Sequence, residues 1–381
     1  MKKTPDIVAA LDSFKGSLSS LEAGNAVKNG ILRRIPHANV TVFAVGDGGE
    51  GTADALCQSL HAEMLNLSVS DTHRSTVTSS MGIVSLDGVK TAVLDMASAA
   101  GIRYAKAHGL DILASTTYGV GEMIRHAVEL DCAEIIVGLG GSGTSDGGMG
   151  ALTALGAVFT DESGTPLTGC TADLGKAAFC DLTPAIDLLK NTKLTLLYDA
   201  GVSLTGEKGA VRMFSRQKGA DDDMIPALEA AMIRYADHCD RAVGAKVSDF
   251  PGAGAAGGLG YGLSLIGGRL TPGADYVLDA IGFDRAAAQA DLIVTGEGKT
   301  DRQTETGKLP MIAAKHACGK PVVCLCGKNE AEDSLCAGGI DCVLAIADGP
   351  LTLEESVERT AELLERTAFN LAGLIRKFCM D

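Results

Sequence analysis

Short apolar runs recur along the chain, and segments with the apolar spacing of helices lie between many of them. The runs cover residues 7–11, 40–45, 93–96, 134–138, 194–198, 292–295, 322–325 and 343–346. We interpret these runs as β-strands. Strands that alternate with helices predict an α/β protein with a largely parallel sheet.

Two helices are marked by a hydroxyl residue followed three positions later by glutamate. Ser19-Ser-Leu-Glu22 predicts a helix that continues to about Arg34, and Thr352-Leu-Glu-Glu355 predicts a second one near the C-terminus. The expected apolar face of the second helix consists of Leu353, Val357, Leu364, Leu371 and Ile375.

The chain of 381 residues is longer than one hydrophobic core normally supports, so we expect two domains. Both ends of the chain show successive βα patterns, whereas the central residues are richer in Gly, Thr and Ser and less regular. We therefore predict a discontinuous α/β domain of residues 1–65 and 285–381. Residues 66–284 are predicted to form an inserted α/β domain that carries the glycine-rich loops.

The 48 glycines are concentrated in a few places, which requires a reason because glycine loses much backbone entropy on folding. The clusters cover residues 46–51, 138–150, 201–219, 252–262 and 296–307. For a single cluster, tight packing of strand on helix is at least as good an explanation as a backbone that approaches a ligand. Five clusters interleaved with Asp, Ser, Thr or Lys favour a shared ligand cleft.

Three segments combine an apolar strand with a loop of glycines, hydroxyls, acids and lysines. The longest loop is Thr295-Gly-Glu-Gly-Lys-Thr-Asp-Arg-Gln303, and the others are Asp12-Ser-Phe-Lys-Gly-Ser17 and Asp47-Gly-Gly-Glu-Gly-Thr52. Backbone N–H groups in such loops bind phosphate, and the acids bind metal ions. The repeated pattern predicts a protein that handles nucleotides or phosphorylated metabolites.

Composition narrows the range of partners. The formal net charge of −15 argues against nucleic acid or an anionic membrane surface as a partner. No apolar run approaches the roughly 20 residues that cross a bilayer, and the N-terminus has no signal-peptide pattern. Eleven cysteines without a C-x-x-C pair are expected to be reduced core residues. We therefore expect a cytoplasmic protein.

One glycine cluster also matches the dinucleotide-binding pattern G-x-G-x-x-G. Gly138-Leu-Gly-Gly-Ser-Gly143 follows a predicted strand, and Asp161 follows a later one, where a ribose-binding acid would stand. These residues favour an NAD(P)-dependent oxidoreductase. Against it, the motif continues as Thr144-Ser-Asp-Gly-Gly148, which suits phosphates and a metal better. A helix capped by Ser145 or Asp146 is the structural alternative.

Six motifs occur in the order found in type 1 glycerate kinases, and together they extend over essentially the whole chain. They are Asp12-Ser-Phe-Lys-Gly-Ser17, Asp47-Gly-Gly-Glu-Gly-Thr52, Gly138-Leu-Gly-Gly-Ser-Gly-Thr-Ser-Asp-Gly-Gly148, Gln217-Lys-Gly-Ala220, Gly254-Ala-Ala-Gly-Gly-Leu-Gly260 and Thr295-Gly-Glu-Gly-Lys-Thr-Asp-Arg-Gln303. The chain thus resembles that family. The resemblance implies an ATP- and Mg²⁺-dependent kinase of organic acid catabolism that converts D-glycerate to 2-phospho-D-glycerate.

The same resemblance implies two α/β domains around a cleft, one Rossmann-like with a mainly parallel sheet and the other mixed. Two segments depart from the family pattern. The usual Ser-Ala-Thr-Asn-Asp reads Ser142-Gly-Thr-Ser-Asp146, which keeps small polar groups. The usual Asn-Pro-Leu reads Val202-Ser-Leu204, so a role that needs an asparagine is not expected at Val202.

Phosphoryl transfer needs charge neutralisation on the phosphates, a divalent ion and an oriented hydroxyl. Lys15 is predicted to be catalytic, because the preceding strand delivers it to the carboxyl edge of the sheet. Asp199 ends another strand and is the expected base for the attacking hydroxyl. The metal is expected at Asp47, Asp146, Glu297 and Asp301.

The remaining assignments follow the type of side chain. The predicted phosphate and nucleotide contacts are Ser13, Gly48, Gly49, Gly140, Gly141, Ser142, Thr144, Gly296, Gly298 and Lys299. The predicted contacts to the substrate carboxylate are Arg216, Lys218 and Arg302, although a solvated basic face would look the same. D-Glycerate and ATP are the expected partners, and a homodimer is left open. A non-catalytic nucleotide-binding protein is the third functional class.

Overall fold

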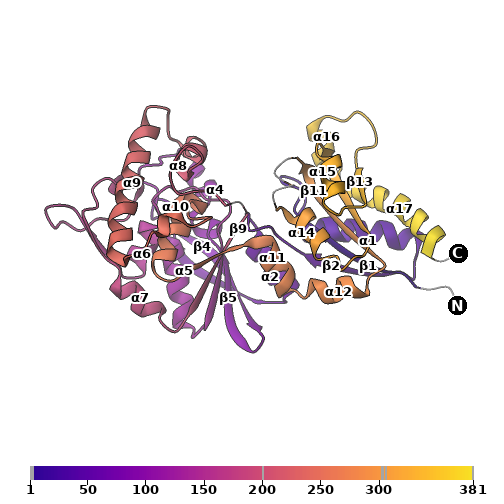
Figure 1. Cartoon of the computed structure of the whole chain (residues 1–381), viewed down its shortest axis with the longest axis horizontal. Coiled ribbons are helices and arrows are strands. Elements are labelled where there is room, and N and C mark those ends of the chain that lie inside the picture. Colours follow the sequence, from indigo (N-terminus) through magenta and orange to yellow (C-terminus); the bar gives the residue numbers. More distant parts are fainter. Residues whose placement is uncertain (1–3, 200, 302–303, 305–306, 380–381) are drawn as a thin grey trace. The chain divides into compact units, whose positions relative to one another are not determined.

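The computed structural model describes residues 4–199, 201–301, 304 and 307–379 and divides the chain into two compact units (Figure 1). Unit 1 comprises Met1–Asp47, Gln58–Leu60 and Ala274–Asp381, and unit 2 comprises Gly48–Cys57 and His61–Gly273. The division falls earlier than residues 65 and 285, where the sequence places the boundaries. The reason at the first boundary is that β3 (Glu63–Ser70) pairs with a strand of unit 2.

Unit 1 is built on a parallel five-stranded sheet in the order β13-β12-β11-β1-β2. Its strands are β1 (Asp6–Leu11), β2 (Asn39–Ala44), β11 (Leu292–Thr300), β12 (Val322–Asn329) and β13 (Cys342–Ala345). Numbered in chain order and read from the β2 edge, they follow the doubly wound order 2-1-3-4-5, in which the direction of strand addition reverses between β1 and β11. Ligands of such sheets bind at this switch point, at the carboxyl ends of the strands.

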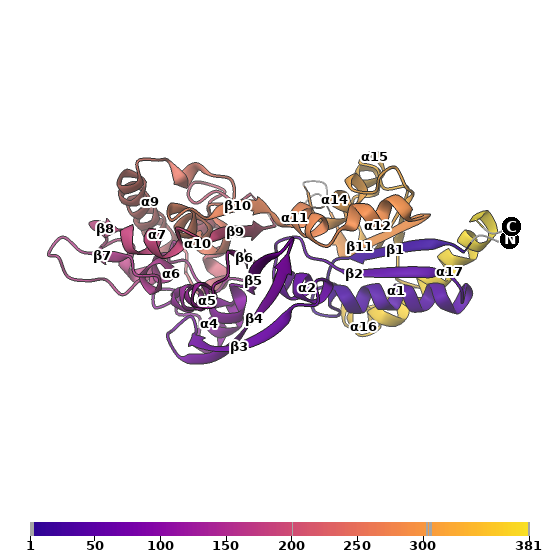
Figure 2. The same ribbon diagram turned by 90° about the horizontal axis from the view of Figure 1, so that it is seen from below.

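Helices cover both faces of the unit 1 sheet (Figure 2). They are α1 (Ser20–Arg34), α11 (Gly273–Ala280), α12 (Phe283–Gln289), α14 (Leu309–Lys315), α15 (Glu332–Ala337), α16 (Leu353–Glu358) and α17 (Thr360–Cys379). The two predicted capping boxes, at Ser19 and Thr352, are both present. Helices α1 and α17 pack against each other, and Val27, Ile31 and Leu364 lie in the core between them.

The predicted apolar face of the C-terminal helix is partly wrong. The helical segment is interrupted at Arg359, so α16 and α17 are separate helices. Leu364, Leu371 and Ile375 of α17 are buried as predicted, whereas the Leu353 side chain of α16 is 82% exposed. A periodic apolar pattern carries no information on a break in the helix axis, and here the break removes Leu353 from the core.

Unit 2 contains a mixed six-stranded sheet in the order β10-β9-β6-β5-β4-β3. Strands β5 (Val89–Asp95), β6 (Glu134–Gly138), β9 (Lys193–Tyr198) and β10 (Arg269–Pro272) are parallel, and β4 (Thr76–Leu86) runs antiparallel to its neighbours. The sequence did not indicate β3, β4 or β10. Their many Ser, Thr and charged residues break up the apolar runs, because these strands are only partly buried.

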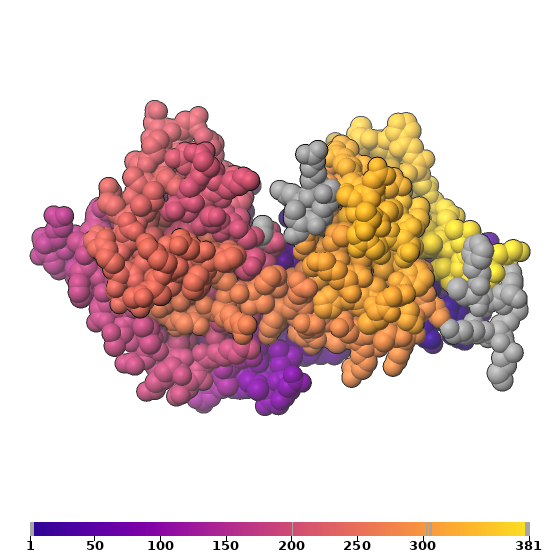
Figure 3. Space-filling model, in the orientation of Figure 1, coloured from indigo at the N-terminus to yellow at the C-terminus, as the bar shows by residue number. Residues whose placement is uncertain are grey.

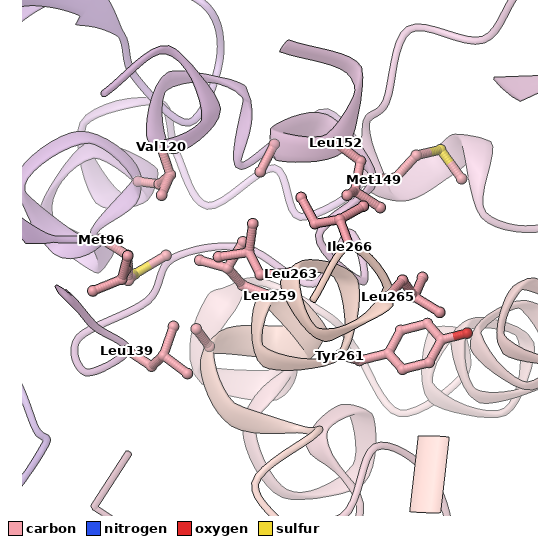
Figure 4. Packing of buried hydrophobic residues seen from close by; sticks show 14 of the residues in the cluster. Met96, Val120, Leu139, Met149, Leu152, Leu259, Tyr261, Leu263, Leu265 and Ile266 are labelled. Carbon is pink, nitrogen blue, oxygen red and sulfur yellow. The ribbon is translucent and has the colours of Figure 1, made fainter. Parts of the chain in front are cut away.

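The core of unit 2 lies between the sheet and its helices. Figure 4 shows Leu259 and Leu263 of α10 (Ala255–Leu265) among Val120, Leu139 and Leu152, all with at most 3% exposed surface. The other elements are α2 (Thr52–Ser59), α3 (Ala97–Ala100), α4 (Ile102–Ala107), α5 (Tyr118–Glu129), α6 (Met149–Ala154), β7 (Val158–Thr160), β8 (Phe179–Asp181), α7 (Thr183–Leu189), α8 (Ala210–Phe214) and α9 (Met224–Val243). Among the described residues, no helix is long and apolar enough to cross a membrane.

Candidate functional site

The carboxyl edge of β1 in unit 1 presents Asp12 and Lys15. Asp12 follows the last residue of the strand and is only 8% exposed, and the backbone N–H of Ser13 donates to its Oδ1 atom at 2.7 Å. A tight turn then pairs Phe14 with Leu18 and places Gly16 at a φ of 80°. This turn leaves the Lys15 side chain exposed. Its position after β1 is at the carboxyl edge of the sheet, where the sequence analysis expected it.

Three carboxylates influence one another electrostatically, and they lie just after β1, just after β2 and within β11. Burial, followed by repulsion from Asp47, raises the pKa of Asp12 to about 8, while the charge of Lys15 acts in the opposite direction. Burial also raises the pKa of Glu297, and Asp47 adds to that shift. We call Asp12, Asp47 and Glu297 the acid cluster. Like charges held together at a buried strand edge are favourable only when a cation balances them.

Glu297 is held in place by two neighbours on the following segment. The Thr304 hydroxyl donates to its Oε1 atom at 2.6 Å, and the Lys308 ammonium lies 3.6 Å from Oε2. Two residues earlier on the same face of β11, the Thr295 hydroxyl is buried and has no hydrogen-bond partner among the described residues. The cluster is therefore preorganised and offers oxygen donors, which hard divalent cations prefer.

In unit 2, the segment that starts at Gly48 packs between the ends of β6 and β9. A Cβ atom on Gly48 would lie 2.3 Å from the carbonyl carbon of Tyr198, and one on Gly140 would lie 2.0 Å from the carbonyl carbon of Gly49. Such contacts exclude any side chain at either position. The structure thus brings together Gly48, Gly49, Gly140 and the strand end that carries Asp199, which the sequence had assigned separately.

Position 141 also requires glycine, but for a different reason from positions 48 and 140. Its φ of 73° lies in the left-handed region, and an added Cβ atom would come within 2.7 Å of the Glu50 carboxylate. The backbone of this loop therefore approaches the Glu50 side chain closely. Asp95, at the end of β5, supports the same region, because both its carboxylate oxygens accept from the backbone N–H of Ala53 at 3.2 Å.

Lys218 lies inside unit 2, with only 3% of its surface exposed. Its ammonium donates to the Ser142 hydroxyl at 2.9 Å and to the Thr144 carbonyl at 2.6 Å. Burial lowers its pKa to about 8, although the charge of Asp146 opposes this shift. The Thr144 hydroxyl is buried without a partner among the described residues. Because Lys218 is buried and hydrogen-bonded to Ser142 and Thr144, it holds the 142–144 segment in place and is not exposed for a direct contact with substrate.

Asp146 is a fully buried acceptor at the start of α6. It accepts from the Thr117 N–H at 2.6 Å, the Thr117 hydroxyl at 2.7 Å, the Gly148 N–H at 3.1 Å and the Gly150 N–H at 3.2 Å. The N-cap residue itself is Gly148, with a φ of 76°, and not Ser145 or Asp146. Four donors occupy the carboxylate, so its geometry favours a framework role over the predicted metal ligation.

The long loop of the C-terminal half differs from its expected form, because β11 continues to Thr300. Gly296 is required for packing, since an added Cβ atom would lie 2.1 Å from the Leu325 carbonyl oxygen. Gly298 has more space, because the atoms nearest to a Cβ atom added there belong to Phe14 and Lys15, at 3.7 and 3.8 Å.

The structure describes two further basic residues that the sequence assigned to ligand contacts, Lys299 and Arg216, and both pair with acidic side chains. The Lys299 ammonium, on the surface, lies 2.8 Å from Glu330 and 3.6 Å from Asp301. Arg216 is also exposed and donates to Asp222 at 2.7 Å. Arg302 is not among the described residues. Of the predicted cations that the structure describes, Lys15 is therefore the one exposed at the switch point.

Asp12 is a candidate site residue that the sequence analysis did not assign. It begins the motif Asp12-Ser-Phe-Lys-Gly-Ser17 directly after a strand, and this position is the signal that could have identified it. The assignment of Asp161 to a ribose is not supported by the topology, since β7 pairs with β8 in a separate two-stranded sheet and not with β6. The Asp161 carboxylate instead accepts from Ser163 and Thr165 within its own turn.

Comparison with known proteins gives a consistent result. The model of the glycerate kinase family matches residues 7–376. A glycerate kinase of Bacillus subtilis (strain 168) is 37% identical over 97% of this chain and 97% of its own length. The glycerate 2-kinase of Escherichia coli (strain K12) is 34% identical, again over 97% of both chains. A crystal structure from Salmonella typhimurium LT2, of a candidate glycerate kinase 2, matches with a TM-score of 0.85 and 34% identity, over 98% of this chain and 99% of that chain.

Proposed function

The chain belongs to the glycerate kinase family, whose members phosphorylate an alcohol group, and we propose that it converts D-glycerate and ATP to 2-phospho-D-glycerate and ADP. The 2-position is favoured by the similarity to a glycerate 2-kinase. At the level of residues, the observation that supports the proposal is the acid cluster beside Lys15 at the switch point of the unit 1 sheet. The similarity to glycerate kinases supports the kinase and not an NAD(P)-dependent oxidoreductase.

Lys15 is proposed to neutralise the negative charge that develops on the transferring phosphoryl group. Phosphoryl transfer leaves little covalent work for a protein, so that positioning and charge stabilisation provide most of the catalysis. Lys15 suits this role because its turn exposes it and because its charge acts on the Asp12 carboxylate of the acid cluster. A lysine acts there as a point charge that follows the phosphate oxygens.

The donor set of the acid cluster fits Mg²⁺. Asp12, Asp47 and Glu297 offer carboxylate oxygens, and repulsion from Asp47 raises the pKa of the other two although Lys15 and Lys308 act in the opposite direction. These three residues would hold the ion, with Asp301 nearby in sequence as a further acid. Bound Mg²⁺ would neutralise charge on the phosphate oxygens of ATP.

The glycine loops of unit 2 are proposed to bind phosphate through backbone N–H groups. Gly48, Gly49 and Gly140 pack backbone against backbone, and the partly exposed Gly141 and Ser142 follow Gly140 in the same loop. Asp47 of the acid cluster and Gly48 of these loops are consecutive in the chain.

Asp199 is proposed to accept the proton of the attacking glycerate hydroxyl. It stands exposed at the end of β9, next to the Gly48 segment. The hydroxyl oxygen forms the new bond to the γ-phosphorus, the bond from that phosphorus to ADP breaks, and the proton passes to Asp199. Arg216 is the proposed contact for the glycerate carboxylate, which would replace the exposed Asp222 carboxylate as its partner.

The product identifies the reaction directly. Incubation of the purified protein with ATP, Mg²⁺ and D-glycerate should give 2-phospho-D-glycerate, as measured by phosphorus NMR. Formation of 3-phospho-D-glycerate would overturn the assignment of the 2-hydroxyl, and absence of any phosphorylated glycerate would overturn the function. In the same assay Asp161→Ala should retain wild-type turnover, because its carboxylate accepts hydrogen bonds from Ser163 and Thr165 of its own turn. Calorimetry should detect no binding of NAD or NADP.

Lys218→Met should separate positioning from stability. We expect kcat/KM to fall by up to about 100-fold, because the loop that carries Ser142 and Thr144 loses its support. The melting temperature should be unchanged or higher, since the variant removes a buried charge without a close carboxylate partner among the described residues.

The pH dependence provides the check on Lys218. Its folded-state pKa of about 8 lies below the ordinary lysine value of 10.5, so the wild type gains stability as pH rises between those values. Lys218→Met should lack that gain. Unchanged kcat/KM in the variant would contradict the positioning role, whatever its stability.

We also infer a reducing compartment such as the cytoplasm. All ten cysteines whose side chains the structure describes are free thiols, and Cys57, Cys132, Cys239, Cys324 and Cys326 are buried. Free thiols in this number are typical of proteins that are not exposed to an oxidising environment.

A further inference from the structure

A second group of metal-ligating side chains lies on the helices of unit 1. Asp279 belongs to α11, Asp284 to the first turn of α12, and His316 directly follows α14. One donor atom from each residue lies within 4.8 Å of the other two. None of the three belongs to the acid cluster or to the strand ends on which the proposed function depends. The segment that contains α11 and α12 reaches the surface on the face drawn in Figure 3.

The His316 ring is oriented from both sides. Its Nδ1 atom lies 2.7 Å from an Asp284 oxygen and 3.9 Å from an Asp279 oxygen, and its Nε2 atom lies 3.3 Å from an Asp275 oxygen. Asp275 and Asp279 are four residues apart on α11 and so share one helix face. A carboxylate on one imidazole nitrogen and an ion on the other is the usual arrangement of metal-bound histidine, in which the carboxylate fixes the ring.

The local charge also favours a cation. Three carboxylates surround a single imidazole, so the group stays negative even when His316 is protonated. The Asp279 and Asp284 side chains are 68% and 57% exposed, whereas that of His316 is 17% exposed. An ion could therefore enter from solvent and keep water molecules as further ligands, while the imidazole forms the fixed side of the site.

We propose that Asp279, Asp284 and His316 bind a divalent transition-metal ion, with Zn²⁺ preferred to Mg²⁺. The imidazole sets the preference, because nitrogen ligands suit Zn²⁺ whereas Mg²⁺ takes oxygen ligands in a strict octahedron. Asp275 orients the ring from its other nitrogen. The ion would join α11, α12 and the end of α14, and α11 begins where the chain leaves unit 2.

The full-length protein, stripped of metal with a chelator and labelled with ¹⁵N-histidine, provides the test. Titration with Zn²⁺ should shift the Nδ1 resonance of His316, and competition with a chromophoric chelator should give the affinity. His316→Gln and the surface variant Asp279→Asn should each weaken Zn²⁺ binding about 10-fold or more. Mg²⁺ at the same concentration should leave the resonance unchanged.

The matched control is His126→Gln. His126 also pairs with an acid, Glu129 at 3.3 Å, but has one carboxylate where His316 has three. This variant should bind Zn²⁺ like the wild type. The free thiols of the protein also bind Zn²⁺, so the decisive quantity is the difference between variant and wild type. An unshifted His316 resonance, or equal Zn²⁺ affinity in His316→Gln and the wild type, would overturn the proposal.

Discussion

Replacement of Lys15 by methionine is expected to lower kcat by about 100- to 1,000-fold, the effect of removing one charge-stabilising group in comparable sites. The melting temperature should stay close to that of the wild type, because the Lys15 side chain is exposed. Its turn is held by backbone contacts between Phe14 and Leu18, which the substitution leaves in place. Steady-state kinetics with saturating ATP and D-glycerate, together with thermal unfolding, measure both quantities.

Lys315→Met is the matched control for this variant. Lys315 is an exposed lysine of unit 1 in the last turn of α14, away from the strand ends that carry the acid cluster. It should keep wild-type kcat. A Lys15→Met protein that is folded and turns over at nearly the wild-type rate would remove Lys15 from the proposed mechanism.

Replacement of Asp12 by asparagine is expected to change activity and stability in opposite directions. We expect kcat to fall by about 100-fold or more, because the acid cluster loses a carboxylate that would hold Mg²⁺. The free protein should become more stable at pH 8, by roughly 1–3 kcal/mol, because repulsion from Asp47 and the burial of a charge both disappear. Asparagine keeps an oxygen that can accept from the Ser13 N–H.

The stability difference should depend on pH in a defined way. The folded-state pKa of Asp12 is about 8 and the ordinary aspartate value is 3.8, so between these values the folded protein holds a proton that the unfolded chain has released. Wild-type stability therefore falls as pH rises through this window. The stability gained by Asp12→Asn should therefore be absent below pH 3.8 and complete above about pH 8.

Thermal unfolding across this pH range measures the effect, at about 2–4 °C for each kcal/mol in a domain of 150–250 residues. Asp333→Asn removes an exposed acid of the same unit and should change stability little at any pH. Lower stability of Asp12→Asn at pH 8 would show that Asp12 is not under repulsion in the free protein. Unchanged kcat would exclude it from the metal site.

Much of unit 1 could be predicted from the sequence. Each of its five strands contains an apolar run, although β2 and β13 are only partly buried. The helix starts at Ser19 and Thr352 depend on contacts within four residues, which a linear pattern records. The position of Lys15 after the first strand was enough to place it at the carboxyl edge of a parallel sheet. The order of the strands in that sheet, and hence the switch point, required the structure.

The partly buried strands of unit 2 and the roles of individual acids could not be predicted in the same way. Asp12, Asp146 and Asp161 all stand near strand ends, in loops of similar composition. Among the described residues, Asp12 has one N–H donor and two acidic neighbours, Asp146 has four donors, and Asp161 accepts hydrogen bonds within its own turn. Only the first of these environments leaves a carboxylate in need of a cation.

The sequence by itself determined the α/β class, the family through six ordered motifs, and the places where strands deliver polar side chains. These properties depend on local periodicity, turn chemistry and order along the chain. The tertiary structure alone decided which glycines must lack a side chain, as Gly48 and Gly140 must, and which cation is buried, as Lys218 is. The physical reason is that burial, hydrogen-bond saturation and charge repulsion arise between segments distant in sequence, and no linear pattern contains their distances.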